Sequence, residues 1–451
     1  MEFSTKGVAA RAEIMVAEMQ QVGMGGGEIR TLETGMRELL RSVGAKALGQ
    51  YLEQQEEEHQ GAALECQCGQ EMAYVCKRQA TILSVFGRVS YRRRYHVCSI
   101  CHVGRSPLDG KLGIEAGQVT AGLAELLALA GIEVAFEEAT RWLERFLLFR
   151  VSDNTLRKET ERFGQLQQEE EAQWQQQSQE VAWLQQRQRE MQKPVGRLYG
   201  SLDGVMAPLV REWRELKNIA WYRVEKVRSY QKRRRPGRRV GEQNDLQAQE
   251  ISYHCDFKTG DEFSDLFWAS ACQRKADLYE ELVFVCDGAV WIWKLIERHF
   301  PHAVQIVDWY HASAYLPPIA EAVFGVGTSP YQAWLENART LLWEGQIDKL
   351  IQACQRLSSP AQTTAAIHKA VTYFTNNQHR MEYARFRQQG YFIGSGTVES
   401  GGKQISGLRL KRAGARWTEQ GALFTAKARA AWLSRTWEVL ASKRTSLPLA
   451  A

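Results

Sequence analysis

Residues 199 to 204 read Tyr-Gly-Ser-Leu-Asp-Gly, and residues 283 to 288 read Val-Phe-Val-Cys-Asp-Gly. Each is a short run typical of a buried strand, and we expect each strand to end at its aspartate. A carboxylate there is costly unless a cation or a hydrogen-bond donor meets it, and two on adjacent strands repel unless divalent metal lies between them. One isolated Asp-Gly is usually a turn. The repetition instead indicates a metal site at Asp203 and Asp287.

The sequence around these two runs predicts an α/β core. Helical patterns at 263–279 and 290–299 surround the fourth of five strand-like runs. Residues 313–390 lack a strand signal and are expected to be wholly helical, and residues 397–440 are expected to form a further basic helical segment. The five expected strands are 196–207, 218–227, 250–256, 282–286 and 303–307.

A third acid would complete a site made of hard oxygen ligands, and Glu399 is the candidate. It lies in Ile-Gly-Ser-Gly-Thr-Val-Glu-Ser-Gly-Gly-Lys, residues 393–403, near the start of an expected helix. Exposed N–H groups and the helix dipole favour negative charge and phosphate at such a position. The three carboxylates would suit divalent cations such as Mg²⁺ or Mn²⁺.

The cysteines predict a second metal site. Five of the nine cysteines fall between Cys66 and Cys101, which in a reducing compartment argues for metal and against disulfides. Cys66-x-Cys68 and Cys98-x-x-Cys101 flank an expected hairpin, and four thiolates could bind one tetrahedral Zn²⁺. Only one residue separates the first pair, so one ligand could be replaced by Cys76, His96 or His102. The alternative is a metal-free hairpin with incidental cysteines.

Basic residues favour a nucleic-acid partner. The formal net charge is +6, and the excess is concentrated in 228–239 and 403–444. The hairpin arginines alternate with Tyr91 and Tyr95, and residues 136–163 predict a helix-turn-helix whose second helix is capped by Ser152. The alternatives are solvated charged surfaces, ordinary packed helices and, for Trp417, a place in the core. The candidate DNA-binding residues are Arg92, Arg93, Arg94, Asn154, Arg157, Lys158, Arg233, Arg234, Arg235, Arg409, Lys411, Arg412, Arg416 and Trp417.

Length and composition limit the class of protein. A chain of 451 residues with 44% hydrophobic and 24% charged residues is typical of a multidomain globular protein, which excludes global disorder and a membrane bundle. The first twenty residues lack a basic start followed by an apolar core, so we expect the cytoplasm, with the nucleoid, as the location. No Walker-type phosphate-binding motif is present, so nucleotide hydrolysis is not supported.

The ordered set of motifs resembles a bacterial insertion-sequence transposase of the ISKra type. A cysteine-paired ribbon and a helix-turn-helix precede five short motifs, and the resemblance covers about residues 25–440. The motifs are Ser-Leu-Asp-Gly-Val (201–205), Glu-Trp-Arg-Glu-Leu-Lys (212–217), Val-Cys-Asp-Gly-Ala (285–289), Asp-Trp-Tyr-His (308–311) and Gly-Ser-Gly-Thr-Val-Glu-Ser (394–400).

The resemblance implies a ribonuclease H-like core with Asp203, Asp287 and Glu399 as its catalytic, metal-binding triad. Two Mg²⁺ or Mn²⁺ ions would support DNA cleavage at terminal inverted repeats and then strand transfer into target DNA. Asp308 is expected to support the site, although it also ends a strand-like run and is the rival for second metal ligand. His311 is expected either to contact phosphate, to position the site, or to be a buried structural histidine.

We therefore expect a multidomain α+β protein that acts on double-stranded DNA as a homo-oligomer. The alternatives are a catalytically inactive or domesticated DNA-binding protein, an inactive copy of the enzyme, and a ribonuclease H-like nuclease without strand transfer. The glutamine-rich segment 165–192 is either a pairing element or a plain exposed spacer. The expected parts are an N-terminal helical region (1–62), a zinc-ribbon-like hairpin (63–112), a helix-turn-helix (113–163), a glutamine-rich linker (164–193), the first part of the core (194–312), a helical insertion (313–390), and the closing catalytic helix with the basic C-terminus (391–451).

Overall fold

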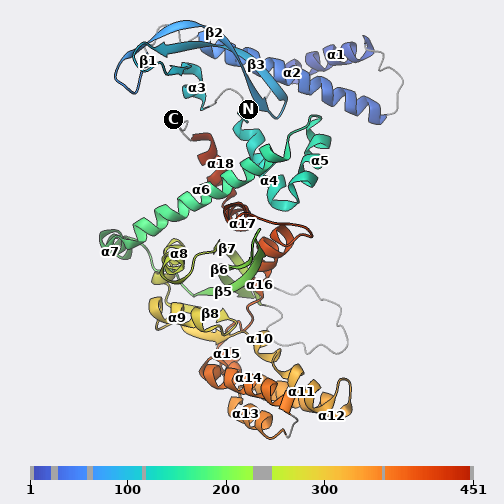
Figure 1. The fold of residues 1–451 in the computed structure, drawn as a ribbon, viewed down its shortest axis with the longest axis vertical. Coiled ribbons are helices and arrows are strands. Elements are labelled where there is room, and N and C mark those ends of the chain that lie inside the picture. The colour runs from blue at the N-terminus through green and yellow to red at the C-terminus, as the bar shows by residue number, and fades with distance from the viewer. Residues whose placement is uncertain are drawn as a thin grey trace. The chain divides into compact units, whose positions relative to one another are not determined.

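The computed structural model of the chain describes residues 5–21, 29–57, 64–113, 118–226, 246–357 and 361–446. These residues form a mixed α+β protein with two separate sheets (Figure 1). The chain divides into two compact units, one of Met1–Phe163 with Glu438–Ala451 and the other of Gly164–Trp437. No helix in the described ranges combines the length and the apolar character needed to cross a bilayer.

The first unit contains the expected hairpin, formed by β2 (Glu71–Ser84) and β3 (Gly87–Cys98). The expected N-terminal helix is confirmed as α2 (Ile29–Glu57), which packs along β3. A side chain at Gly49 would place its Cβ 2.7 Å from the Ser90 carbonyl oxygen, so glycine permits this close approach. The unit also contains α1 (Thr5–Gln21), β1 (Leu64–Glu65), β4 (Gly104–Arg105) and α3 (Pro107–Leu112).

The expected helix-turn-helix segment is also helical. Ser152 Oγ accepts a hydrogen bond from the Thr155 N–H at 3.1 Å, which confirms the expected cap. The last helix does not stop at residue 163 but continues through the glutamine-rich segment, so the expected linker boundary falls inside a helix. The elements are α4 (Ala121–Glu133), α5 (Phe136–Leu147), α6 (Asp153–Gln179), α7 (Val181–Glu190) and, from the C-terminus, α18 (Trp437–Ser446).

The second unit is built on a five-stranded sheet in the order β7-β6-β5-β8-β9. In this sheet β6 pairs antiparallel with both β5 and β7, whereas β8 pairs parallel with both β5 and β9. All five expected strands are therefore confirmed. Their bounds are β5 (Arg197–Pro208), β6 (Trp213–Lys226), β7 (Leu246–Asp256), β8 (Glu281–Cys286) and β9 (Val304–Val307).

Helices α8 (Gly260–Gln273) and α9 (Val290–His299) accompany the sheet as expected. Trp221 of β6 is wholly buried, donates its indole N–H to Ser270 Oγ at 2.9 Å, and packs against Phe267 and Phe284. These aromatic contacts bury the face of the sheet next to α8.

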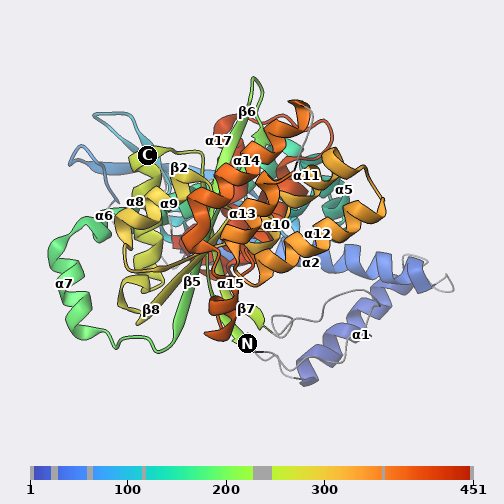
Figure 2. The ribbon, with the colours of Figure 1, turned by 90° about the horizontal axis from the view of Figure 1, so that it is seen from below.

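Residues 313–390 are helical within the described ranges and contain no strand there, as expected, and Figures 1 and 2 show α11 to α14 grouped together. The expected basic helical segment over 397–440 is mostly helical, with a break at residues 411–418, where Trp417 bridges to Leu209. The remaining elements are α10 (Trp309–Ser313), α11 (Leu316–Phe324), α12 (Ser329–Trp343), α13 (Ile347–Gln355), α14 (Ala361–Asn377), α15 (Tyr383–Gln388), α16 (Gly396–Gly402), a π-helix (Lys403–Leu410) and α17 (Glu419–Leu433).

A buried charge network joins three elements of the second unit. Lys427 Nζ of α17 lies 2.5 Å from Glu171 Oε2 of α6 and 3.1 Å from Asp256 Oδ2 of β7. His254 Nδ1 lies 3.1 Å from the other oxygen of Glu171. Burial alone would raise the pKa of Glu171, but Lys427 and His254 hold it down at about 2. The glutamine-rich segment is therefore not a plain exposed spacer, since Glu171 packs inside the unit.

Replacing Lys427 with methionine should destabilise the second unit by roughly 3 to 5 kcal/mol, because Glu171 and Asp256 would remain buried without their cation. Urea unfolding followed by tryptophan fluorescence measures this change. The matched control is Arg298→Met, which breaks the exposed ion pair with Asp261 and should cost less than about 1 kcal/mol. Equal losses in the two variants would show that the buried network contributes no more than a surface pair.

Candidate active site and metal centre

Asp203 lies inside β5, so the expectation that the strand ends there is wrong, since β5 continues to Pro208. The parallel pairing with β8 spans only Arg197 to Gly200, and Asp203 lies past it, paired across from Asn218 of β6. Asp287 directly follows the end of β8, as expected. The Leu202 N–H donates to Cys286 Sγ at 3.4 Å, which ties together the residues that precede the two aspartates.

Glu399 is placed by α16, whose first turn contains it. Ser395 Oγ donates to Glu399 Oε1 at 2.8 Å. A Cβ built on Gly402 would lie 2.8 Å from Val205 Cγ2 and 3.6 Å from Asp203 Oδ2. Only a residue without a side chain lets α16 rest this closely on β5, so Gly402 is a site residue that our sequence reasoning missed. The Gly401-Gly402 pair after the acid was the available signal.

The three acids share one electrostatic environment. Burial and then the charge of Asp287 raise the pKa of Asp203 to about 6, and Glu399 adds to this rise. The Gly204 N–H and His311 act in the opposite direction. Two like charges from other elements therefore act on Asp203, an arrangement that a divalent cation would relieve.

The donor set fits hard divalent cations. Asn218, wholly buried beside Asp203, donates from Nδ2 to the Leu216 carbonyl at 3.0 Å, while its Oδ1 has no hydrogen-bond partner among the described residues. Carboxylate and amide oxygens are the ligands that Mg²⁺ prefers. Within the described ranges, the only group whose ligand atoms all lie within 4.8 Å of one another is the cysteine cluster, so the three carboxylates are spaced more widely.

Asp308 has both oxygens engaged by backbone donors. Its Oδ1 accepts from the His311 N–H at 2.5 Å, and its Oδ2 accepts from the Ser395 N–H. The side chain is wholly buried. Burial raises the pKa of Asp308, and these two N–H groups oppose the rise. Asp308 therefore joins the start of α10 to the turn before α16, which favours the expected supporting role over its rival role as a metal ligand.

His311 is exposed, so the reading as a buried structural histidine is wrong. Its ring lies 6.2 Å from that of Tyr315 and 6.3 Å from that of Tyr373, measured between centroids. The charge of His311 acts to lower the pKa of Asp203. The imidazole thus lies near both the Asp203 carboxylate and the rings of Tyr315 and Tyr373.

The four expected zinc ligands come together in the first unit. Cys66 Sγ lies 3.3 Å from Cys101 Sγ, and Cys68 Sγ lies 3.5 Å from Cys98 Sγ. A tetrahedral Zn²⁺ with bonds of about 2.3 Å separates its sulfurs by roughly 3.8 Å, so the four thiols could bind a metal such as zinc. The backbone N–H groups of Cys101 and Ile100 lower the pKa of Cys98 to about 6, which favours the thiolate.

The tight spacing of the first cysteine pair is accommodated by a turn. The Gly69 N–H donates to the Cys66 carbonyl at 2.9 Å, and Gly69 has φ +78°, which favours glycine. The alternative ligands proposed for this pair, Cys76, His96 and His102, lie outside the cluster formed by the described residues.

Not all the candidate DNA-binding residues of the hairpin are exposed to solvent. Arg92 is exposed, but Arg93 forms a mostly buried ion pair with Asp109, and Arg94 is half-buried. Tyr91 is buried and donates to Asp109 Oδ1 at 3.3 Å. The Arg78 guanidinium lies 3.6 Å above the Tyr95 ring. The expected alternation of arginine and tyrosine therefore serves packing as well as any contact with DNA.

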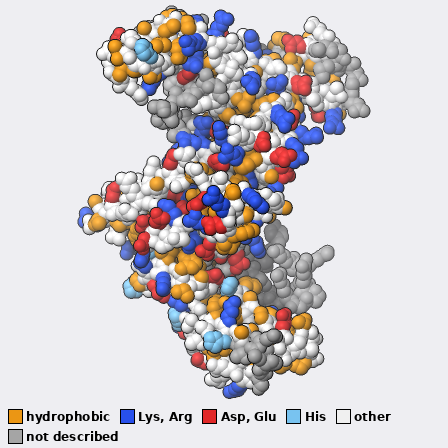
Figure 3. Space-filling model, viewed as in Figure 1, with side chains coloured by type: hydrophobic (Ala, Val, Ile, Leu, Met, Phe, Trp, Pro, Cys, Tyr) orange, Lys and Arg blue, Asp and Glu red, His pale blue; other side chains and the backbone are white. Residues whose placement is uncertain are grey.

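The other candidate DNA-binding residues also differ in whether their side chains are exposed to solvent. Asn154 and Lys158 are exposed, while Arg157 is held by Asn154 Oδ1 at 2.9 Å and by Glu161 at 2.9 Å. On the face shown in Figure 3, basic side chains lie interspersed with acidic ones. Of the C-terminal candidates, Lys411 and Arg416 are exposed, Arg412 is half-buried, and Arg233, Arg234 and Arg235 lie outside the described residues.

Arg409 and Trp417 are buried, so the expectation that they contact DNA is wrong. The Arg409 guanidinium lies 4.8 Å above the Trp417 ring. Trp417 Nε1 donates to the Leu410 carbonyl at 3.1 Å. The indole therefore holds the end of the π-helix and belongs to the core.

No protein-family model matches the chain, and no curated protein matches it at a significant level.

Zinc analysis of the purified protein should find one Zn²⁺ per chain bound by the four-cysteine cluster. Cys98→Ser should lose it, because three thiolates hold the ion far more weakly than four. Elemental analysis by mass spectrometry after dialysis measures the ratio. Cys76→Ser is the matched control and should keep its zinc, since Cys76 lies outside the cluster. Equal zinc in the Cys98 variant and the parent would contradict the site.

Asp203→Asn should stabilise the metal-free protein at pH 8, by a few degrees in melting temperature. The native pKa of about 6 lies above the ordinary value of 3.8, so ionised Asp203 destabilises the fold fully above about pH 6 and not at all well below pH 4. The gain should therefore shrink as the pH falls from 8 to 4. Thermal unfolding in EDTA measures it, with exposed Asp265→Asn as the control. A gain that is independent of pH would contradict the raised pKa of Asp203.

Proposed function

We propose that this chain is a DNA transposase that cuts insertion-sequence ends and joins them to target DNA at Asp203, Asp287 and Glu399. One observation carries the proposal. Asp287, after the end of β8, and Glu399, on a helix packed against the sheet, both act on Asp203 of the central strand, and no lysine or arginine among the described residues forms an ion pair with Asp203. The missing positive charge is supplied most simply by divalent cations.

The topology supports a ribonuclease H-like core for this enzyme. Three antiparallel strands followed by two parallel ones, in the order β7-β6-β5-β8-β9, are what that core requires. Asp203 on the first strand, Asp287 after the fourth and Glu399 on a later helix match the roles that the resemblance implies. The helical residues 313–390 lie between the second and third acids, as an insertion in such a core would.

The chain's own residues would hold the site as follows. Asp203, Asp287 and Glu399 would bind two Mg²⁺ or Mn²⁺ ions, which when bound stabilise the entering and departing oxygens of phosphoryl transfer. Ser395 orients Glu399, and the Ala289 N–H donates to Asp287 Oδ1 at 2.9 Å, which sets the direction of that carboxylate. Asp308 holds the turn that carries Ser395. No serine or tyrosine nucleophile is assigned, because the chemistry requires none.

The first unit supplies candidate DNA-contacting surfaces. The cysteine cluster would hold a structural Zn²⁺ at the end of the hairpin, and Arg92, Asn154 and Lys158 remain exposed for contact with double-stranded DNA. Two transposon ends must be brought together for transfer, so we propose that the working enzyme is a homo-oligomer.

Asp203→Asn, Asp287→Asn and Glu399→Gln should each reduce Mg²⁺-dependent cleavage of DNA carrying the element's terminal repeats by about a hundredfold or more. Each variant removes a charge that would bind the ions. Gel analysis of cleaved and joined strands measures the activity, and fluorescence anisotropy in EDTA should show retained DNA binding.

Asp308→Asn distinguishes the two candidate second ligands. Normal cleavage by Asp287→Asn together with loss in Asp308→Asn would move the assignment to Asp308. Cleavage without joining to a supercoiled plasmid would indicate a nuclease, and binding without cleavage in the parent protein would indicate a DNA-binding regulator or an inactive copy.

A further inference from the structure

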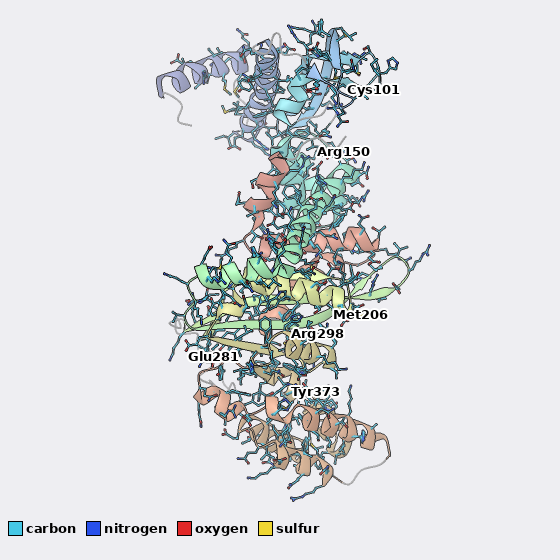
Figure 4. All side chains as sticks on the ribbon, turned by 90° about the vertical axis from the view of Figure 1, so that its left-hand side faces the viewer. Cys101, Arg150, Met206, Glu281, Arg298 and Tyr373 are labelled. Carbon is cyan, nitrogen blue, oxygen red and sulfur yellow. The ribbon has the colours of Figure 1, made fainter. Side chains whose placement is uncertain are left out.

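A cavity of about 540 Å³ opens beside the second acid of the proposed site. It lies between α9 and α14, and Figure 4 shows Tyr373 of α14 near the sheet. Its size is that of a small-molecule site, enough for one nucleotide and too small for a duplex. The lining residues used below are Gly288, Trp293, Lys294, Tyr315, Lys369 and Tyr373.

The cavity adjoins the acids through direct contacts. Tyr373 Oη donates to the Asp287 carbonyl at 3.3 Å. Gly288, the residue after the acid, has φ +91°, and a Cβ there would lie 2.8 Å from the Tyr373 ring. A ligand in the cavity would therefore lie within a few ångströms of the backbone that carries the Asp287 carboxylate.

Aromatic rings form one wall. Tyr315 and Tyr373 stack with their centroids 4.1 Å apart and their planes 16° apart, and both are half-buried. Trp293 lies on the opposite element, α9, with the Arg380 guanidinium 4.5 Å above its ring. The half-buried tyrosine pair, unlike the buried Trp293, offers ring surface on which a nucleobase can pack regardless of its identity.

Positive charge lies at the mouth. Lys294 and Lys369 are exposed and come from the two facing helices, and Lys369 Nζ lies 5.8 Å from the centroid of the Tyr315 ring. The acid in the lining, Glu297, is already paired with Arg380 at 2.7 Å. The lysine charges therefore favour an anion here.

We propose that this cavity holds one unpaired nucleotide of the DNA strand whose reacting phosphate lies at the three acids. Its base packs against the Tyr315–Tyr373 pair, and its phosphate lies between Lys294 and Lys369. The inference rests on the proposed function and deepens it, because it assigns to the helical insertion the recognition of a DNA end whose terminal base pair has opened.

Binding of fluorescein-labelled (dT)₁₂ and of a blunt 12-base-pair duplex to the full-length protein in EDTA tests the cavity. Lys294→Glu and Lys369→Glu should each weaken (dT)₁₂ binding about tenfold and lower the salt dependence of log K by roughly 0.7. Tyr373→Leu should weaken it roughly 5- to 50-fold, whereas Tyr373→Phe, which keeps the ring, should bind nearly as the parent does. Duplex binding should change less than twofold in every variant.

Lys349→Glu is the matched control, since Lys349 is an exposed lysine of α13 outside the cavity, and it should bind (dT)₁₂ like the parent. Unchanged (dT)₁₂ binding in the Lys294, Lys369 and Tyr373 variants overturns the proposal, and so does an equal loss of duplex binding. A protein that fails to cleave with Mg²⁺ but shows the expected binding differences would refute the proposed catalysis and leave the cavity assignment intact.

Discussion

The site depends on how the fold surrounds two acids of the same unit, the buried Glu171 and the half-buried Asp203. Glu171 receives Lys427 and His254 from its own chain, and its pKa is held at about 2 in spite of burial. Burial and then the neighbouring carboxylates of Asp287 and Glu399 raise the pKa of Asp203 to about 6. The fold thus buries a lysine beside Glu171 but places acids, without a lysine or arginine ion pair among the described residues, beside Asp203. This contrast is the physical basis for proposing a cation site.

The neighbourhood of the acids is organised by backbone donors and glycine. Asp308 uses both its oxygens to hold the starts of two helical segments, and Ser395 between them orients Glu399. Gly402 brings α16 onto β5 at a distance that any side chain would increase. These contacts hold Glu399, which comes from a distant part of the chain, close to the sheet. The cost of repulsion is thus offset by packing and hydrogen bonds around the site.

Much of the fold could be predicted because residue patterns within short segments indicate strands and helices. The β-branched and apolar runs located every strand of the second sheet, and the absence of a strand signal over 313–390 indicated its helices. The cysteine cluster was predictable since two short-range pairs flanked one hairpin, which needs only a turn to close. Arg93, Arg409 and Trp417 were misjudged for the opposite reason: a basic or aromatic side chain looks the same in sequence whether it faces solvent or pairs with a partner far along the chain.

The sequence by itself determined the order of the elements, the identity of the three acids and the four thiols, and the glycines that follow Asp287 and Glu399. Tertiary structure alone decided that Asp203 lies within a strand and not at its end. It also decided that both carboxylate oxygens of Asp308 accept hydrogen bonds from backbone N–H groups, and that the Tyr373 hydroxyl contacts the Asp287 carbonyl. The reason is that periodicity and turn chemistry act over a few residues. Charge pairing, helix-to-sheet approach and cavity walls depend on segments that meet only when the chain has folded.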